Sequence, residues 1–350
     1  MSAAVGGRGG IERVTTLVVG EMRERGHHVA IHLFGPSRNP GWEENLEESY
    51  VGPQQRHSNF VCRWLHVLWW ATGSIRAFDP DLVIGMTPSA LVVSRVVRLL
   101  IRSRYQIWSW LHEAMSQLEH GWGVRWADAH LAISTGLGQD IAETVGASDN
   151  VYVVYNPTVP APIQPRPGLN DGVHFVYIGR LDNSVKRIED ILLALSSIRE
   201  PWRLTIVGDG EDRHILVDLA ARLHISDSVQ WVGWSHDPWS AAGTVSALIL
   251  ASISEGFGVV LAEALTRGVP VVASDCHHGP RDIVLPNLNG WLYPPGDVAA
   301  LQAILLRIVK DPYQLPDPYT VKATAARFYL ARVVDRMLDA VTTFTATISS

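Results

Sequence analysis

The stretch VSALILASISEGFGVVLAEALTRGVPVVASD, Val245–Asp275, predicts one complete strand–helix–strand unit. VSALILAS is a β-rich apolar run, and the glycines of EGFG allow a tight turn. VVLAEALTRG is typical of a helix closed by glycine, and VPVVAS is a second strand. Two strands joined by a helix form a parallel βαβ unit, so this stretch predicts an α/β fold.

The same alternation continues on the N-terminal side of this stretch. The strand-like runs VHFVYIG, WRLTIVG and VQWVGW alternate with the helical patterns RIEDILLALSSI and DRHILVDLAARLH. Further upstream, HHVAIHLFG, PDLVIGM, YQIWSWLH, ADAHLAIS and NVYVVYNP form a second series of strands. Repeated alternation of this kind predicts parallel, doubly wound sheets.

A proline-rich segment separates the two series. PTVPAPIQPRPGLNDG, residues 157–172, holds five prolines within eleven residues and predicts a linker. We therefore expect two Rossmann-like domains facing across a cleft, an N-terminal domain over residues 1–156 and a C-terminal domain over residues 157–325. The final helical pattern, residues 326–350, can pack back on the N-terminal domain.

The N-terminal domain departs from this scheme at its start. A glycine-rich loop such as GGRGGIERV normally follows a strand, but only MSAAV precedes it. Gly9 and Gly10 would let the backbone approach a phosphate closely, so we count both among the residues that bind the ligand. A loop without a ligand is the alternative. We expect the first strand of this domain to be missing or truncated.

Composition excludes several classes of protein. The net charge of −6 gives no overall basic field, so we expect no nucleic-acid partner. Cys62 and Cys276, the chain's two cysteines, lie far apart, which excludes a disulfide framework and a cysteine zinc site. The N-terminus lacks the apolar core of a signal peptide, and no apolar run is long enough to span a bilayer. We expect a cytoplasmic protein.

Two segments of the N-terminal half mix apolar and basic residues. They are RWLHVLWW, Arg63–Trp70, and SRVVRLLIRSR, Ser94–Arg104. One interpretation is a core helix with a solvated basic edge. The other is peripheral contact with the anionic inner face of the plasma membrane.

Two carboxylates flank the glycine turn of the stretch quoted first. Glu255 precedes the turn, and Glu263 lies one to two turns into the helix that follows. The free amides at the start of that helix, Gly258–Val260, form an anion site. Carboxylates accept hydrogen bonds from paired sugar hydroxyls, so acids on both sides of an anion site suit a nucleotide sugar. Surface glutamates on an amphipathic helix are the alternative.

Two cations follow the strand VHFVYIG. Arg180 comes directly after the strand, and Lys186 comes six residues later at the start of a helix. Ligands of open α/β sheets bind at this edge, and fixed cations there would neutralise a diphosphate. They would act most strongly as a leaving diphosphate gains charge. Solvated surface charge is the alternative, and the neighbouring Arg187 leaves open which side chain points inward.

Other polar residues carry weaker signals. His112 ends the run YQIWSWLH and would face the cleft, although a buried, satisfied histidine is the alternative. The DPD sequence at Asp79–Asp81 is explained by a Pro-Asp turn before a strand. His277 and His278 lack partners at metal-ligand spacing. We expect no metal site.

These motifs together resemble a known family. Glu255 and Glu263 match the EX7E motif of the retaining glycosyltransferases of family 4, which have the GT-B fold. The resemblance extends to GRL…K, VGDGED, GVPVVASDC, GPRDIV and NGWLYPPGD. It covers most of the chain and is strongest over Ala127–Asp297. HLAIS, VVYNP, VQWVGW…PW and SDCHHGPRDIV look most like bacterial lipopolysaccharide galactosyltransferases of the 1,6-galactosyl type.

The resemblance implies roles for the charged residues of the C-terminal domain. Glu263 would hold the ribose hydroxyls of UDP, and Glu255 would face the donor hexose. Arg180 and Lys186 would bind the diphosphate.

It also implies roles for backbone groups and for one residue of the other domain. The amides near Gly258, Val259 and Val260 would help to bind the diphosphate, and the segment around Gly233 would hold the uracil. His112 would approach the donor sugar from the N-terminal domain.

The implied activity is retaining, metal-independent transfer of a hexose, galactose from UDP-galactose, to a lipopolysaccharide core or another glycan or lipid-linked acceptor. The nucleotide sugar is a co-substrate, and no cofactor is expected. Two alternatives stay open. A nucleotide-sugar epimerase of the same architecture would convert the donor without an acceptor, and an inactive truncated paralogue would only bind a partner.

Overall fold

The computed structural model describes residues 10–34, 49–51, 60–168 and 171–349. Contacts divide the chain into two compact units, each described by itself. Unit 1 comprises residues 1–157 and 330–350, and unit 2 comprises residues 158–329. The expectation of a missing or truncated first strand concerns residues 1–9, which lie outside the described residues.

Unit 1 is built on a four-stranded parallel sheet with the order β3-β4-β5-β6. Its strands are β3 (Leu82–Gly85), β4 (Gln106–Leu111), β5 (Ala129–Ala132) and β6 (Val151–Val153). A separate parallel pair joins β1 (Ile31–Leu33) to β2 (Ser49–Val51). β4 and β5 are buried along nearly their whole length. Continuous burial explains why their sequences do not alternate between apolar and polar residues.

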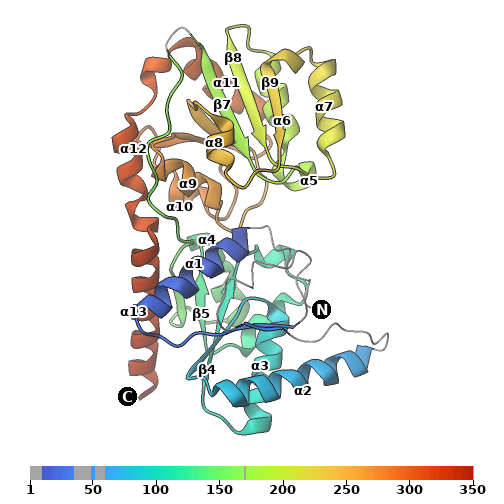
Figure 1. The fold of residues 1–350 in the computed structure, drawn as a ribbon, viewed down its shortest axis with the longest axis vertical. Helices are drawn as coiled ribbons and strands as arrows, with labels where there is room; N and C mark the ends of the chain where they lie inside the picture. The colour runs from blue at the N-terminus through green and yellow to red at the C-terminus, as the bar shows by residue number, and fades with distance from the viewer. Residues whose placement is uncertain (1–9, 35–48, 52–59, 169–170, 350) are drawn as a thin grey trace. The chain divides into compact units, whose positions relative to one another are not determined.

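Helices of unit 1 come from both ends of the chain. The helical segments of its N-terminal part are α1 (Gly10–Glu24), α2 (Phe60–Phe78), α3 (Pro88–Ile101), η2 (Met115–Gln117), η3 (Gly121–Trp126) and α4 (Thr135–Val145). α13 (Leu330–Ser349) packs on α1, where Arg25 forms an ion pair of 2.6 Å with Asp335 (Figure 1). Phe344 of α13 also lies edge-on to Trp108 of β4. The last helix therefore completes the unit that the first residues begin.

Unit 2 contains a six-stranded parallel sheet with the order β12-β11-β10-β7-β8-β9. Its strands are β7 (Val173–Ile178), β8 (Trp202–Val207), β9 (Val229–Gly233), β10 (Ala247–Leu250), β11 (Val271–Ser274) and β12 (Gly290–Tyr293). The first strand of the unit, β7, pairs with both β8 and β10. The winding direction reverses between β7 and β10, and ligands of such sheets bind at the carboxyl ends of the strands at this switch point.

Two groups of helices accompany this sheet. The helical segments are α5 (Asn183–Lys186), α6 (Ile188–Ser196), α7 (Arg213–Arg222), η4 (Ser226–Ser228), α8 (Pro238–Ala242), α9 (Val259–Thr266), α10 (Pro280–Ile283), α11 (Val298–Lys310), η5 (Pro312–Gln314), α12 (Pro318–Thr324) and η6 (Ala325–Phe328). α6 packs with α7 and α11, whereas α9 packs with α10 and α12. Phe175 and Tyr177 of β7 join the core formed with the α6 group. The sheet is thus doubly wound, as the sequence predicts.

The sequence predicts the proline-rich segment only as a linker. In the structure its described part is bonded along unit 2. Gln164 donates from its backbone to Arg267 O at 2.9 Å, and Ala161 O accepts a bond of 2.6 Å from Lys322 Nζ. The final helical pattern, expected from residue 326, is corrected at its start, since η6 ends at Phe328 and α13 begins at Leu330.

None of the helices in the described part of the chain combines the length and hydrophobicity needed to cross a bilayer.

Candidate functional site

The candidate site of unit 2 is centred on an ion pair. Lys186 Nζ lies 2.7 Å from Glu255 Oε1, and the two side chains are 20% and 11% exposed. Ser252 Oγ donates to the same carboxylate oxygen at 2.6 Å. Ile253 N also bonds to Val185 O at 2.9 Å, which ties the segment after β10 to α5. Two motifs 69 residues apart in the chain therefore meet at the switch point.

Arg180 follows β7 by two residues, at the same edge of the sheet as this pair. Its side chain is exposed, and its carbonyl accepts a hydrogen bond of 2.8 Å from the buried Tyr177 hydroxyl. Burial first, and the nearby charge of Glu255 second, raise the pKa of Tyr177. Tyr177 is therefore neutral. Its hydroxyl group holds the backbone of Arg180 by a hydrogen bond, and Glu255 lies close enough to affect its pKa.

The structure decides between the two neighbouring cations. Arg187 forms ion pairs with Glu189 at 2.6 Å and with Asp190 at 2.9 Å. Lys186 instead bonds to Glu255. The sequence placed Lys186 at the start of a helix, but it ends the short helix α5, and Arg187 in a left-handed conformation links α5 to α6. This backbone turn separates the two side chains.

The start of α9 supplies the expected backbone donors. Gly258 is its N-cap residue with a φ of 84°, and no side chain caps the helix. Helix geometry leaves the amides of Val259 and Val260 without intrahelical acceptors, so they are available to an anion. Gly279, at φ +88°, packs so closely against the backbone of Phe257 that a Cβ atom would collide with it. The contact with Gly279 therefore holds the loop that leads into α9 in place.

A row of glycines lies along the same edge of the sheet. Gly208 N donates to Gly233 O at 2.8 Å, and Gly179 N donates to Val207 O at 3.0 Å. A Cβ atom on Gly208 would collide with Gly179 O. Gly233 ends β9 with a φ of 83°. The segment expected to hold the base thus lies two strands from Arg180 on the same carboxyl edge.

Glu263 lies within α9 and is half-buried. Its carbonyl accepts hydrogen bonds from Thr266 Oγ1 at 2.7 Å and from the Arg267 guanidinium at 3.2 Å. It therefore shares its helix with the free amides of Val259 and Val260. Its contact with a ribose stays a prediction.

The expected residues of unit 1 are described within that unit only. His112 follows the last residue of β4, its ring lies 4.5 Å from that of Trp110, and its Nε2 is buried without a hydrogen-bond partner among the described residues. Burial lowers the pKa of His112 to about 3, so the ring is neutral at pH 7. Gly10 is the first residue of α1, and Gly9 lies outside the described residues. The approach of His112 to a donor sugar stays a prediction.

Sequence reasoning missed the residues that hold Glu255 in place. Ser252 donates to Glu255, and Ser274, the last residue of β11, donates in turn to Ser252 O. Burial, reinforced by the charge of Glu255, raises the pKa of the neighbouring Cys276 thiol to about 12. The positions of Ser252 and Ser274 could have indicated this role, because small polar residues at the ends of buried apolar strands meet at one edge of a parallel sheet.

Comparisons with known proteins bear on the family of this chain. Residues 8–161 match the family described as Glycosyltransferase Family 4, and residues 164–325 match Glycosyl transferases group 1. The lipopolysaccharide 1,6-galactosyltransferase of Escherichia coli strain K12 is 30% identical over 95% of this chain and 94% of its own length. The chain belongs to the family 4 glycosyltransferases. The Salmonella typhimurium 1,6-galactosyltransferase is 31% identical to this family 4 glycosyltransferase, over 93% of each chain.

Solved structures match the fold of this glycosyltransferase. The apo form of the lipopolysaccharide outer core galactosyltransferase WaaB aligns with a TM-score of 0.88 and 27% identity, covering 97% of each chain. Anabaena HepE in complex with UDP aligns with a TM-score of 0.83 and 20% identity, covering 97% of this chain and 98% of HepE. The GT-B fold expected from the motifs is confirmed.

Proposed function

We propose that this glycosyltransferase moves galactose from UDP-galactose to a lipopolysaccharide core or a related glycan acceptor, with retention of configuration and without a metal ion. The observation that carries the proposal is the Lys186–Glu255 pair at the switch point of unit 2. The two relatives of about 30% identity are named as lipopolysaccharide 1,6-galactosyltransferases, which favours galactose and this acceptor. HepE, which shares the fold, is named in complex with UDP and with UDP-glucose, which favours a UDP-sugar donor.

Charge neutralisation is the first task of the proposed site. Arg180 and Lys186 face the diphosphate, and the amides of Val259 and Val260 contribute their N–H groups. Because charge on the diphosphate grows as the glycosyl bond breaks, these donors stabilise the transition state more than the ground state. Two cations and a helix terminus supply the function that a divalent metal would otherwise serve.

Binding of the two sugars is the second task. Glu255 accepts hydrogen bonds from hydroxyls of the transferred hexose, and Glu263 accepts them from the ribose that stays on UDP. Lys186 leaves its pair with Glu255 when the diphosphate binds. Ser252 then keeps the carboxylate in position, because it bonds to the same oxygen at 2.6 Å.

A membrane-bound acceptor is consistent with the surface of unit 1. Leu65 and Trp69 of α2 are 61% and 73% exposed, and Leu99 and Leu100 of α3 are 66% and 61% exposed. Exposed arginines follow α3, among them Arg102. Apolar side chains with nearby cations suit the anionic, cytoplasmic face of the plasma membrane. Co-sedimentation with vesicles of phosphatidylglycerol should be lost in Trp69→Ser; equal binding to neutral vesicles would contradict the proposal.

The test of the activity is a transfer assay with a panel of UDP- and GDP-sugars, with and without a lipopolysaccharide acceptor. UDP-galactose should be consumed with acceptor, chelator should not slow the reaction, and the product should keep the anomeric configuration of the donor by NMR. Glu263→Ala and Arg180→Ala should each reduce turnover by orders of magnitude without unfolding the protein. Unchanged turnover in both variants overturns the assignment.

Product analysis also separates the alternatives. An epimerase would convert the UDP-sugar when the acceptor is omitted. An inactive binding protein would bind UDP tightly in calorimetry and show no turnover with any donor.

A further inference from the structure

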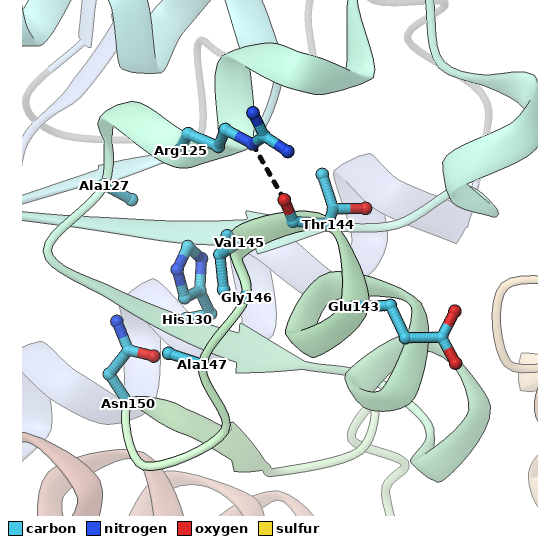
Figure 2. A pocket seen from close by; sticks show the side chains of 9 residues that line it. All are labelled: Arg125, Ala127, His130, Glu143, Thr144, Val145, Gly146, Ala147 and Asn150. Atoms are coloured by element: carbon cyan, nitrogen blue, oxygen red, sulfur yellow. Dashed lines mark hydrogen bonds between the residues drawn. The ribbon is translucent and has the colours of Figure 1, made fainter.

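Unit 1 contains a pocket of about 460 Å³ that the proposed reaction does not use. Figure 2 shows its walls, which come from η3, β5 and the end of α4 with the loop that follows. The lining residues are Arg125, Ala127, His130, Glu143, Thr144, Val145, Gly146, Ala147 and Asn150.

The pocket lies at the amino edge of the unit 1 sheet. His130 is the second residue of β5, and Asn150 directly precedes β6. His112 follows the last residue of β4, which pairs in parallel with β5. Since parallel strands begin at one edge and end at the other, the pocket and His112 lie at opposite edges of the sheet.

Three polar side chains in the pocket retain unused hydrogen-bonding capacity. His130, 1% exposed, bonds through Nδ1 to Ser109 Oγ at 2.8 Å, and its Nε2 has no partner within the described residues. Asn150 donates to Asp128 O at 3.0 Å, while its Oδ1 is buried with no partner in the described part of the chain. Arg125 uses Nε to bind Thr144 O at 2.7 Å, which leaves its terminal nitrogens for another acceptor (Figure 2). A buried polar group without a hydrogen-bond partner destabilises the protein, and a ligand hydroxyl that bonds to it would remove this penalty.

The charges favour a neutral ligand. Arg125 and Glu143 contribute opposite charges, and the carboxylate of Glu143 points away from His130 in Figure 2. Burial lowers the pKa of His130 to about 4, so its ring adds no charge at pH 7. The C-terminal end of α4 also disfavours an anion.

The shape and chemistry favour a sugar over other neutral ligands. The volume falls within the range of small-molecule sites, and Ala127, Val145 and Ala147 offer short apolar walls. A sugar ring presents hydroxyls that both donate and accept, beside an apolar C–H face. We propose that this pocket binds one neutral sugar unit, at a site separate from the donor site of unit 2. The inference goes beyond the proposed function and does not require it.

The direct test is NMR of the full-length protein with labelled histidines, saturated with UDP. Methyl α-galactopyranoside and methyl α-glucopyranoside are titrated, and the Cε1–H signal of His130 is followed. A saturable shift with a millimolar dissociation constant is expected for at least one of them. The constant should rise at least tenfold in Asn150→Ala and Arg125→Ala, each checked for folding by circular dichroism.

Matched variants keep the two sites apart. Asp149→Asn, at an exposed residue of the same loop that does not line the pocket, should leave the constant unchanged, and so should Glu263→Ala, which tests the donor site. No saturable shift in the unaltered protein, or an equal shift in Asn150→Ala and Arg125→Ala, overturns the proposal. Loss of transfer in Glu263→Ala with an intact His130 shift separates this inference from the proposed function.

The sugar unit has two possible sources, and kinetics distinguishes them. If it belongs to the acceptor glycan, Arg125→Ala should raise the KM for a long oligosaccharide acceptor and leave that for a short one unchanged. If it is a free saccharide, the His130 shift persists and both KM values stay the same.

Discussion

The two units share one architecture and differ at their edges. At the carboxyl edge of the unit 2 sheet, Lys186 and Glu255 meet, and close-packed glycines such as Gly279 hold the loops. Unit 1 has two neutral histidines, His112 and the buried His130, and exposed apolar side chains on its helices. In both units the parallel sheet sets where side chains gather, while the residues at its edges decide what they do.

The largest effect should distinguish two adjacent cations of unit 2. Lys186→Ala removes the partner of Glu255 and a proposed diphosphate ligand, so we expect transfer to fall by about 10²–10³-fold. Arg187→Gln is the matched control, since Arg187 pairs with Glu189 and Asp190. It should lower stability and leave the turnover of folded enzyme within a few fold. Equal kcat losses in the two variants would remove the functional distinction between them.

The next effect concerns the glycines that hold the loops of unit 2. Gly279→Ala places a methyl group against the backbone of Phe257 at a φ of +88°, so we expect a loss of about 3 kcal/mol or more in unfolding free energy. Gly296→Ala also has a positive φ, +76°, but no atom lies within 4 Å of the added Cβ. Gly296→Ala should therefore lower the unfolding free energy by only about 1–2 kcal/mol. Urea unfolding of the two variants measures the difference, and equal costs would show that the close contact is unimportant.

A third effect concerns the stability of unit 1, to which α13 belongs. Met337 of α13 is 1% exposed, and truncating a buried methionine costs about 2–4 kcal/mol. Met337→Ala should therefore accelerate hydrogen exchange in β4 and β5 and leave β7 and β10 unchanged. The exposed Thr342→Ala, on the same helix, should change little. Faster exchange confined to unit 2 would contradict the assignment of α13 to unit 1.

A fourth effect is a dependence on pH. Burial lowers the pKa values of His112 and His130 to about 3 and about 4, below the ordinary value of 6.5. Below pH 6.5 the unfolded chain binds protons that the folded chain does not, so stability decreases as pH falls from 6.5 to about 4. Each histidine should contribute about 1 kcal/mol per pH unit. Urea unfolding at pH 7 and pH 5 measures the loss.

Matched histidine variants test the origin of this dependence. His130→Asn should reduce the dependence of the unfolding free energy on pH, whereas a change at the exposed His214, His214→Gln, should not. A slope unchanged in His130→Asn would mean that other groups cause the acid sensitivity.

The sequence predicted the elements well and their details less well. Apolar runs bounded by glycine predicted the strands and the two parallel sheets, and the spacing of Arg180, Glu255 and Glu263 around glycine turns made them candidates for the site. The proline-rich segment was predicted only as a linker, and its bonds to Arg267 and Lys322 were not predicted because those residues lie far along the chain. The position of Lys186 was misread because the left-handed turn at Arg187 carries no composition signal.

The sequence by itself determined the fold class, the family and the chemical types at the candidate site, because these follow from local periodicity and from motifs of fixed spacing. Only the tertiary structure decided which cation meets Glu255, that Ser252 and Ser274 support it, and that α13 completes unit 1. The pocket beside His130 also appears only there. The physical reason is that strand order and side-chain contacts depend on residues distant in the chain, which local pattern cannot specify.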